Sequence, residues 1–268
     1  MFDFMAILTA FLVVAGVGLV LGILLALFTQ FFGIEDDPKV KAVRGALPGA
    51  NCGACGFKGC DDYAKAVAEG RAAPNLCIPG GADTVAALSE VLGVEAEAAA
   101  PKVAFIHCNG VCGATSPKAE YDGMQTCKAS GMVFGGAGSC VYGCIGCGDC
   151  ASVCPADAIC IRDGIAHVDP RACIGCMACT KACPKHIISM LPKDAVVANF
   201  CSNKEKGADA RKNCKNACIG CKKCEKSCPN GAITVIDNNA IVDYEKCTHC
   251  GACAEACPTK CLKAVNFQ

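Results

Sequence analysis

The sequence contains no tryptophan in 268 residues, and aromatic side chains of every kind make up only 6% of it. Lys and Arg together number 25, as do Asp and Glu, so the formal net charge is zero. Nucleic-acid binding usually needs a basic surface, often interleaved with aromatic residues. The net charge gives no global bias toward nucleic acid or an anionic surface, and no basic–aromatic interleaving appears, so the sequence gives no support for nucleic-acid binding.

Signatures of an independent active site are also missing. No Gly-rich phosphate loop follows an expected strand, so no flavin or nicotinamide site is visible. No Ser/His/Asp set or carboxylate pair is placed for acid–base chemistry. Three of the four histidines, His107, His186 and His249, lie near cysteines, where we expect surface or turn positions. We therefore expect no catalytic residue beyond those that carry electrons.

Cysteine, in contrast, is abundant, with 28 residues. Such a content is typical of short secreted proteins held by disulfides. Here, however, the cysteines form tight CxxCxxCxxxCP runs, in which neighbouring thiols cannot all reach disulfide partners without strain. The same spacing is typical of bacterial iron–sulfur proteins. Bound clusters would also replace part of the apolar core that such small segments need.

The CxxCxxCxxxCP run occurs four times, as two pairs with equal separations. Short β-type segments lie between the runs at 159–161, 165–168, 233–236 and 240–242, with turn signals at Asp163–Gly164 and Asn238–Asn239. This is the (βαβ)₂ plan of a two-cluster ferredoxin, present twice. In such proteins the cysteine before proline ligates the other cluster. The predicted [4Fe–4S] ligand sets are Cys144, Cys147, Cys150 with Cys183; Cys173, Cys176, Cys179 with Cys154; Cys218, Cys221, Cys224 with Cys257; and Cys247, Cys250, Cys253 with Cys228.

Structural zinc is the alternative for these four sets. Zinc usually takes two separated CxxC pairs, so complete runs favour clusters. A fifth [4Fe–4S] cluster, again with zinc as the alternative, is expected at Cys52, Cys55, Cys60 and Cys77, spaced CxxCx4Cx16C. The glycines in this set, Gly53, Gly56 and Gly59, let the backbone wrap a cluster and aim amides at its sulfurs.

Four more cysteines form a weaker set. A sixth cluster, with partly buried free thiols as the alternative, is expected at Cys108, Cys112, Cys127 and Cys140. Cys160, Cys201, Cys214 and Cys261 are left over, and their separation gives no geometric reason for a seventh cluster. For Cys160 and Cys261 we expect buried free thiols, because a free cysteine behaves as a small hydrophobe.

The N-terminal region predicts a membrane anchor. No charged residue occurs from Phe4 to Ile34. This uncharged stretch is longer than the roughly 20 residues that span a bilayer. A cleaved signal peptide would need a basic start and a shorter apolar core, whereas here the start carries Asp3. Lys and Arg follow the helix and none precedes it, so we expect a single-pass protein of the cell membrane with its clusters on the cytoplasmic side.

Taken together, these features predict an α+β protein. It has one N-terminal transmembrane helix, a small four-cysteine [4Fe–4S] domain and two tandem bacterial 2[4Fe–4S] ferredoxin-like modules. The expected divisions are the anchor at 1–34, the four-cysteine domain at 35–92, a linker and Gly/Cys-rich segment at 93–140, and the modules at 141–200 and 201–268.

One stretch, 202–226, carries eight Lys and Arg against three acidic residues. A solvated face is one explanation. The other is a docking surface for an acidic electron donor such as a soluble ferredoxin, which would be steered electrostatically.

The order of these features resembles a known family. An apolar helix, then LPGANCGACGFKGC with its distal Cys77, then GCIGCGDCASVCP, is similar to the B subunit of Rnf complexes. The resemblance implies a component of an ion-translocating ferredoxin:NAD⁺ oxidoreductase of anaerobes and other bacteria. It implies reduced ferredoxin as donor, and other membrane and flavin subunits as partners. The chain departs from the simplest members by having two ferredoxin modules, which leaves the cluster count and the entry point open.

Two alternative functions remain at this stage. One is a homologous electron-transfer subunit that keeps the cluster of a redox-sensing regulator reduced. The other is a scaffold that carries clusters without electron flow, but it would need exposed, labile clusters, whereas interlocked ferredoxin motifs bury theirs.

Overall fold

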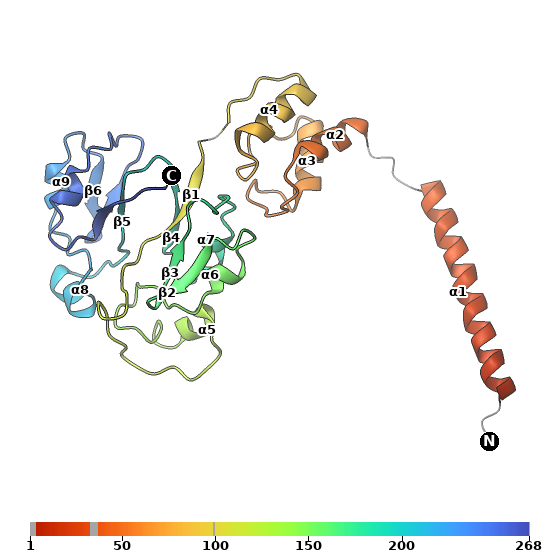
Figure 1. The fold of residues 1–268 in the computed structure, drawn as a ribbon, viewed down its shortest axis with the longest axis horizontal. Coiled ribbons are helices and arrows are strands. Elements are labelled where there is room, and N and C mark those ends of the chain that lie inside the picture. The colour runs from red at the N-terminus through yellow and green to blue at the C-terminus, as the bar shows by residue number, and fades with distance from the viewer. Residues whose placement is uncertain (1–3, 33–36, 99, 268) are drawn as a thin grey trace. The chain divides into compact units, whose positions relative to one another are not determined.

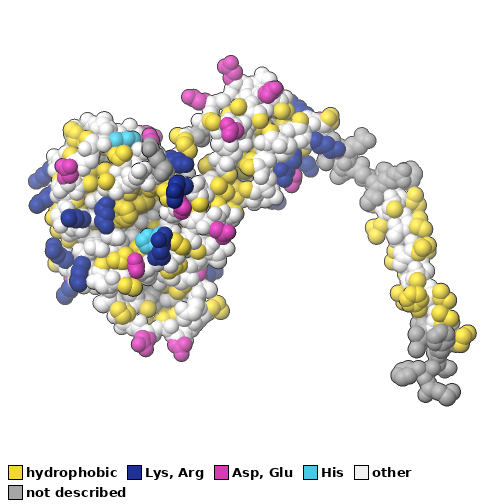
Figure 2. All heavy atoms as spheres, viewed as in Figure 1, with side chains coloured by type: hydrophobic (Ala, Val, Ile, Leu, Met, Phe, Trp, Pro, Cys, Tyr) yellow, Lys and Arg dark blue, Asp and Glu magenta, His cyan; other side chains and the backbone are white. Residues whose placement is uncertain are grey.

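The computed structural model describes residues 4–32, 37–98 and 100–267. Its contacts divide the chain into two compact units, one up to Lys41 and one from Ala42 onward. The first unit contains helix α1 (Phe4–Phe32), which has 29 residues. At 1.5 Å per residue this is about 43 Å, more than the roughly 30 Å of a bilayer core. Every side chain from Phe11 to Phe28 is exposed, and hydrophobic atoms cover the described part of the helix (Figure 2), so α1 is a candidate membrane span.

Three helices form the region of the first cysteine set. Helix α2 (Pro38–Ala46) begins with proline after Asp37, whose Oδ1 accepts from the Lys39 amide at 2.9 Å. Helices α3 (Cys60–Ala68) and α4 (Gly81–Leu92) follow. The hydroxyl of Tyr63, a side chain that is 1% exposed, donates to Ala73 O at 2.8 Å and accepts from the Leu76 amide at 3.3 Å. Tyr63 thereby fixes the loop that carries Cys77.

The same order of elements, β-α-α-β-β-α-β, occurs twice after this region (Figure 1). The first module contains β1 (Lys102–Ile106), α5 (Cys127–Met132), α6 (Asp149–Ser152), β2 (Ile159–Arg162), β3 (Ile165–Val168), α7 (Ala178–Ala182) and β4 (Ile188–Pro192). The second contains β5 (Val197–Asn199), α8 (Gly207–Asn213), α9 (Lys223–Ser227), β6 (Ile233–Ile236), β7 (Asn239–Val242), α10 (Ala252–Glu255) and β8 (Leu262–Ala264). The structural repeat is therefore longer than the cysteine repeat. Its first copy begins with β1, which lies in the segment 93–140.

Strand pairing is the same in both modules. The first and last strands pair antiparallel, β1 with β4 and β5 with β8, and the middle strands form hairpins, β2 with β3 and β6 with β7. The first hairpin turns at Asp163–Gly164, where both φ angles are positive, as expected. The second turns at Asp237 and Asn238, one residue earlier than predicted, because these two residues hold the positive φ angles and Asn239 already belongs to β7.

Strand β1 connects the two modules, because its alternate side chains pack into two different cores. Ala104 and Ile106 pack into the core of the first module with its cysteines. Val103 and Phe105 face the other way and pack with Ala198 of β5 in a shared core. The Phe105 ring lies 4.8 Å from that of Phe200, centroid to centroid, in an edge-on arrangement. The two modules therefore form one packed body.

His107 extends this junction. Its Nδ1 lies 2.7 Å from Asn199 O and its Nε2 lies 2.6 Å from Ser189 Oγ, so the ring spans both modules. Desolvation by burial lowers its pKa. The expectation of a surface or turn position is wrong for His107, because the alternation of β1 carries it between two strands. His186 does close a turn, because its amide donates to Cys183 O at 3.1 Å, and both His186 and His249 have positive φ.

Candidate iron–sulfur sites

The first cysteine set converges around a glycine-rich loop. Cys77 is buried, and desolvation raises the pKa of its thiol, with nearby Cys60, Cys55 and Cys52 adding to the rise. All four predicted residues are therefore close enough to interact. The loop needs glycine where it turns: φ is +67° at Gly53, where an added Cβ would also come within 3.3 Å of Phe57 O.

In the first ferredoxin-like module, the cysteines before proline cross between the runs. Burial raises the pKa of Cys150 to about 12, and the neighbouring thiols that contribute include Cys144 and Cys183. Burial likewise raises the pKa of Cys179 to about 11, with Cys173, Cys176 and Cys154 contributing. Cys183 thus lies with the first run and Cys154 with the second, as the ferredoxin pattern predicts.

The second module repeats this exchange. Burial raises the pKa of Cys224 to about 11, and the contributing neighbours are Cys218, Cys257 and Cys221. Burial also raises the pKa of Cys253, where Cys247 and Cys228 contribute. In both modules a backbone amide four residues on donates to the cysteine before proline, Ala158 to Cys154 Sγ at 3.3 Å and Ala232 to Cys228 Sγ at 3.2 Å. These donors fit thiolates that ligate a cluster.

Two leftover cysteines differ in their surroundings. Cys261, 2% exposed, is a buried thiol as expected, and its Sγ lies 3.6 Å from Cys257 Sγ. The hydrogen bond from Cys261 lowers the pKa of Cys257. Cys160, in contrast, is exposed, and the expectation that it is buried is wrong. It lies on β2, where alternation turns Ile159 inward and Cys160 outward.

The structure does not bring the predicted set of Cys108, Cys112, Cys127 and Cys140 together. Cys112 is exposed, and its sulfur lies against the β2–β3 turn, 3.2 Å from a Cβ built on Gly164. Cys127 begins α5, whose position is fixed by Asp149, because Asp149 Oδ1 accepts from the Cys127 amide at 2.8 Å. Its thiol therefore lies beside Cys147 in the first module.

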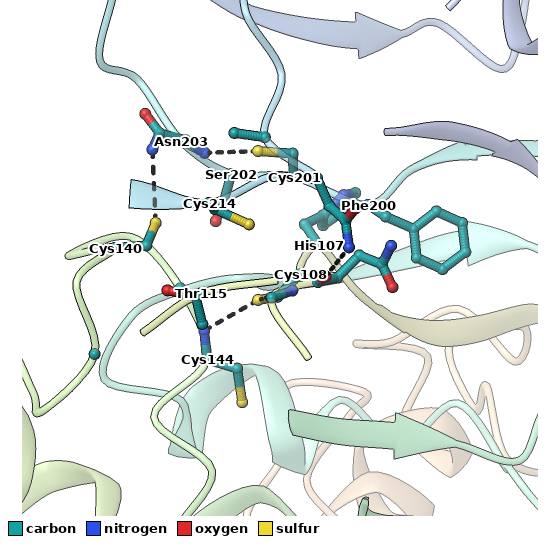
Figure 3. A pocket seen from close by; sticks show the side chains of 16 residues that line it. His107, Cys108, Thr115, Cys140, Cys144, Phe200, Cys201, Ser202, Asn203 and Cys214 are labelled. Atoms are coloured by element: carbon teal, nitrogen blue, oxygen red, sulfur yellow. Dashed lines mark hydrogen bonds between the residues drawn. The ribbon is translucent and has the colours of Figure 1, made fainter. Parts of the chain in front are cut away.

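Cys108 and Cys140 instead meet two cysteines of the second module. Together with Cys201 and Cys214 they line a cavity of about 40 Å³ at the junction (Figure 3). Figure 3 shows these four sulfurs around a common space, whereas the sulfur of Cys144 turns away from it. Burial raises the pKa of Cys201 to about 12, and Cys140 contributes to the pKa rise of Cys108, Cys201 and Cys214 alike.

A zinc ion and a [4Fe–4S] cluster differ in the spacing that they require between four sulfurs. Tetrahedral zinc with Zn–S bonds of about 2.3 Å requires sulfurs about 3.8 Å apart. In the part of the chain that the structure describes, no three Cys, His, Asp or Glu side chains converge closely enough for one metal ion. A cube of four irons and four sulfides holds its thiolates farther apart than one zinc ion does.

Sequence reasoning missed the involvement of Cys201 and Cys214. The signal was present as a longer motif: Cys140 precedes Cys144 by four residues, as Cys214 precedes Cys218, so both modules contain CxxxCxxCxxCxxxCP. The stretch from Cys108 to Cys140 is much longer than that from Cys201 to Cys214 and contains two extra cysteines, which hid the equivalence.

The fold and these sites define a multicluster iron–sulfur electron-transfer protein. Models of protein families match the same regions. A family described as "Putative Fe-S cluster" matches residues 47–79. A 4Fe-4S dicluster domain family matches residues 143–187 and again 217–261, and a second family of that description matches 172–232.

Known relatives place the chain more narrowly. It is 44% identical over 260 residues to the B subunit of the Na⁺-translocating ferredoxin:NAD⁺ oxidoreductase complex of Acetobacterium woodii, covering 95% of this chain and 78% of the relative. It is 40% identical to the B subunit of the proton-translocating complex of Clostridium ljungdahlii, over 93% of this chain and 89% of the relative. With the B subunit of an ion-translocating oxidoreductase complex of Methanosarcina acetivorans, identity is 36% over 94% of this chain and 96% of the relative. The chain belongs to this family, the B subunits of the Rnf complexes. Its candidate span and these complexes indicate a membrane protein.

Proposed function

We propose that this chain accepts electrons from reduced ferredoxin and relays them through at least five [4Fe–4S] clusters toward the other subunits, including a flavin subunit, of an ion-translocating ferredoxin:NAD⁺ oxidoreductase complex. The crossed cysteine pairs carry this proposal, since Cys183, Cys154, Cys257 and Cys228 each lie with the partner run. When bound, the clusters supply one-electron oxidation and reduction; the chain supplies thiolates, amide donors and partial exclusion of water.

The ligands are the predicted cysteines of the first set and of the four ferredoxin runs. Exchange of the cysteine before proline interlocks each pair of clusters within one module, and the innermost cysteines are buried. Interlocked, buried sites support electron transfer over a scaffold role, which would release its clusters. The names of the relatives favour a ferredoxin:NAD⁺ oxidoreductase over a system that reduces a regulator.

Electron entry is proposed at the second module. There the middle cysteine of each run, Cys221 and Cys250, is exposed, whereas Cys147 and Cys176 in the first module are partly or fully buried. Lys and Arg side chains gather over the part of the molecule that holds α8 and α9 (Figure 2). The exposed basic residues of this face are Lys204, Lys206, Arg211, Lys212, Lys215, Lys222, Lys223 and Lys226. An acidic ferredoxin would be steered to this basic face.

The proposed arrangement is an anchor at 1–34, a four-cysteine domain at 35–92 and two ferredoxin-like modules. The cysteine runs of the modules lie in 141–200 and 201–268, but their first strands, β1 and β5, lie before these bounds, so the expected linker at 93–140 is part of the first module. Lys39, Lys41 and Arg44 follow α1, which supports placing every cluster on the cytoplasmic side. A reducing cytosol would also keep the thiols available to iron.

Anaerobic reduction of the purified full-length chain tests this function. Iron and sulfide would be loaded and quantified, then reduced ferredoxin added while visible absorbance and EPR spectra are followed. We expect ferredoxin to bleach the absorbance and to produce the EPR signals of reduced clusters. If dithionite reduces the clusters but ferredoxin does not, the donor assignment is wrong. If neither iron nor sulfide binds, cluster binding itself is refuted.

A further inference from the structure

The cysteines at the junction occupy equivalent positions in the two modules. Cys108 lies two residues beyond the end of β1, and Cys201 lies two residues beyond the end of β5. Cys140 and Cys214 each stand four residues before a CxxCxxC run. Each module therefore contributes one cysteine after its first strand and one before its first run. A [4Fe–4S] cluster takes four cysteine thiolates, and here four separate loops supply them.

Hydrogen bonds across the junction hold these four loops against one another. Thr115 Oγ1 donates to Asn213 O at 2.8 Å, and Asn216 Nδ2 donates to Asn109 O at 2.8 Å. These bonds tie the loop of Cys108 to that of Cys214. Ser202 Oγ donates to Tyr142 O at 2.8 Å and ties the loop of Cys201 to that of Cys140. The thiols are thus placed by structure on both sides of the junction.

Each of the four sulfurs also has an N–H donor. Cys108 Sγ accepts from the amides of Gly110 at 3.4 Å and Cys144 at 3.3 Å. Cys201 Sγ accepts from those of Asn203 at 3.4 Å and Cys218 at 3.3 Å.

The remaining two sulfurs are served by side-chain and backbone donors. The side-chain amide of Asn203, a residue 1% exposed, donates to Cys140 Sγ at 3.6 Å. The backbone amide of Asn216 donates to Cys214. Such donors stabilise negative sulfur and tune cluster potentials.

The four sulfurs also surround an open space. The cavity between the four cysteines, about 40 Å³, is larger than the one of about 20 Å³ at Cys144, Cys150 and Cys183, where the ferredoxin pattern already expects a cluster. A Cβ built on Gly110 would lie 3.5 Å from Cys108 Sγ and 3.9 Å from Cys214 Sγ, so these two sulfurs face the same small volume. Glycine at this position keeps that volume open.

We propose that Cys108, Cys140, Cys201 and Cys214 together bind a [4Fe–4S] cluster at the junction of the two ferredoxin-like modules. This inference rests on the cluster-binding part of the proposed function. The site lies directly between the modules, because two of its sulfurs accept hydrogen bonds from Cys144 and Cys218, each a predicted ligand of its own module. One electron crossing the junction would oxidise a cluster on one side and reduce one on the other, with no bond made or broken.

Iron and sulfide analysis of the full-length chain tests this site. With five other clusters, the wild type should hold about 24 irons, and a Cys201→Ser/Cys214→Ser variant should lose about four irons and four sulfides. The matched control is Cys112→Ser/Cys160→Ser, which changes two exposed cysteines outside the junction and should lose none. Loss in the control, or unchanged iron in the junction variant, would overturn the assignment, as would the loss of one zinc instead.

A single Cys201→Ser variant provides a second readout if the double variant does not fold. It exchanges one thiolate for a weaker hydroxyl ligand, so we expect a new EPR signal while the signals of the other clusters persist. An EPR spectrum identical to that of the wild type would refute the junction site. Absence of all clusters from the wild type would instead refute the proposed function.

Discussion

Reversing four charges on the basic face of the second module should slow reduction by ferredoxin in a salt-dependent way. Lys204, Lys206, Arg211 and Lys212 are all exposed, and replacing them with Glu changes the charge of this face by eight units. Two unit charges about 10 Å apart in water interact by about 0.4 kcal/mol. With one acidic charge on the donor, the change of eight units weakens the attraction by about 3 kcal/mol in total at very low salt, which corresponds to roughly a hundredfold slower association.

The difference in rate between the variant and the wild type should depend on the salt concentration. At about 0.1 M ionic strength the Debye length is about 10 Å, which reduces the effect to about 1 kcal/mol, or roughly sevenfold. At about 1 M it should vanish. Stopped-flow mixing of reduced ferredoxin with the oxidised protein, at several salt concentrations, measures these rates.

A matched control reverses Lys58, Lys65, Lys128 and Lys181, which are exposed but lie outside the basic face. Its rate should stay near that of the wild type. Equal slowing in both variants would mean that only net charge matters. Slowing in the control alone would place the entry point elsewhere and refute the proposed docking face.

Three further changes test the junction. Phe105→Ala should weaken module packing by about 3 kcal/mol and speed iron loss to a chelator, whereas Phe134→Ala, at a side chain 84% exposed, should not. The pKa of His107 is lowered in the folded protein, so the free energy of unfolding should fall as the pH drops below about 6.5, the pKa of an unfolded histidine. Thermal melting between pH 8 and 5 should show this loss of stability. The His107→Gln variant should reduce the loss, whereas the His186→Gln variant should not. Asn203→Leu removes the side-chain donor to Cys140 and should lower the potential of one cluster in an EPR redox titration, whereas an unchanged set of potentials would contradict the assignment.

Local spacing allowed much of the fold to be predicted. In each CxxCxxCxxxCP run, three ligands come from one short loop, and the fourth is supplied by a partner run at fixed separation. The hairpins followed from β-branched segments and turn residues, with the turn at Asp237 and Asn238 displaced by one position because asparagine and aspartate both tolerate positive φ. These features depend on neighbours in the sequence, which is why they could be recognised there.

The junction depended on tertiary contacts instead. Cys108 and Cys201 are brought together because β1 and β5 pack on a shared core, and no local spacing records that packing. Cys112 is close to Cys108 in sequence, yet its sulfur lies against the β2–β3 turn, so proximity along the chain suggested the wrong partner. The exposure of Cys160 and the placement of His107 likewise follow from strand alternation within particular pairings.

Cluster ligands are shared between separate parts of the chain in two ways, between the runs of one module and between the two modules. Within a module, each run gives its last cysteine to the other run, so neither site is complete without both halves. Across the junction, each module gives two cysteines, so the site at Cys108, Cys140, Cys201 and Cys214 is complete only when the modules are docked. The shared core around Phe105 therefore controls more than stability: loosening it should affect the junction cluster before the interlocked pairs, because only the junction ligands are divided between modules.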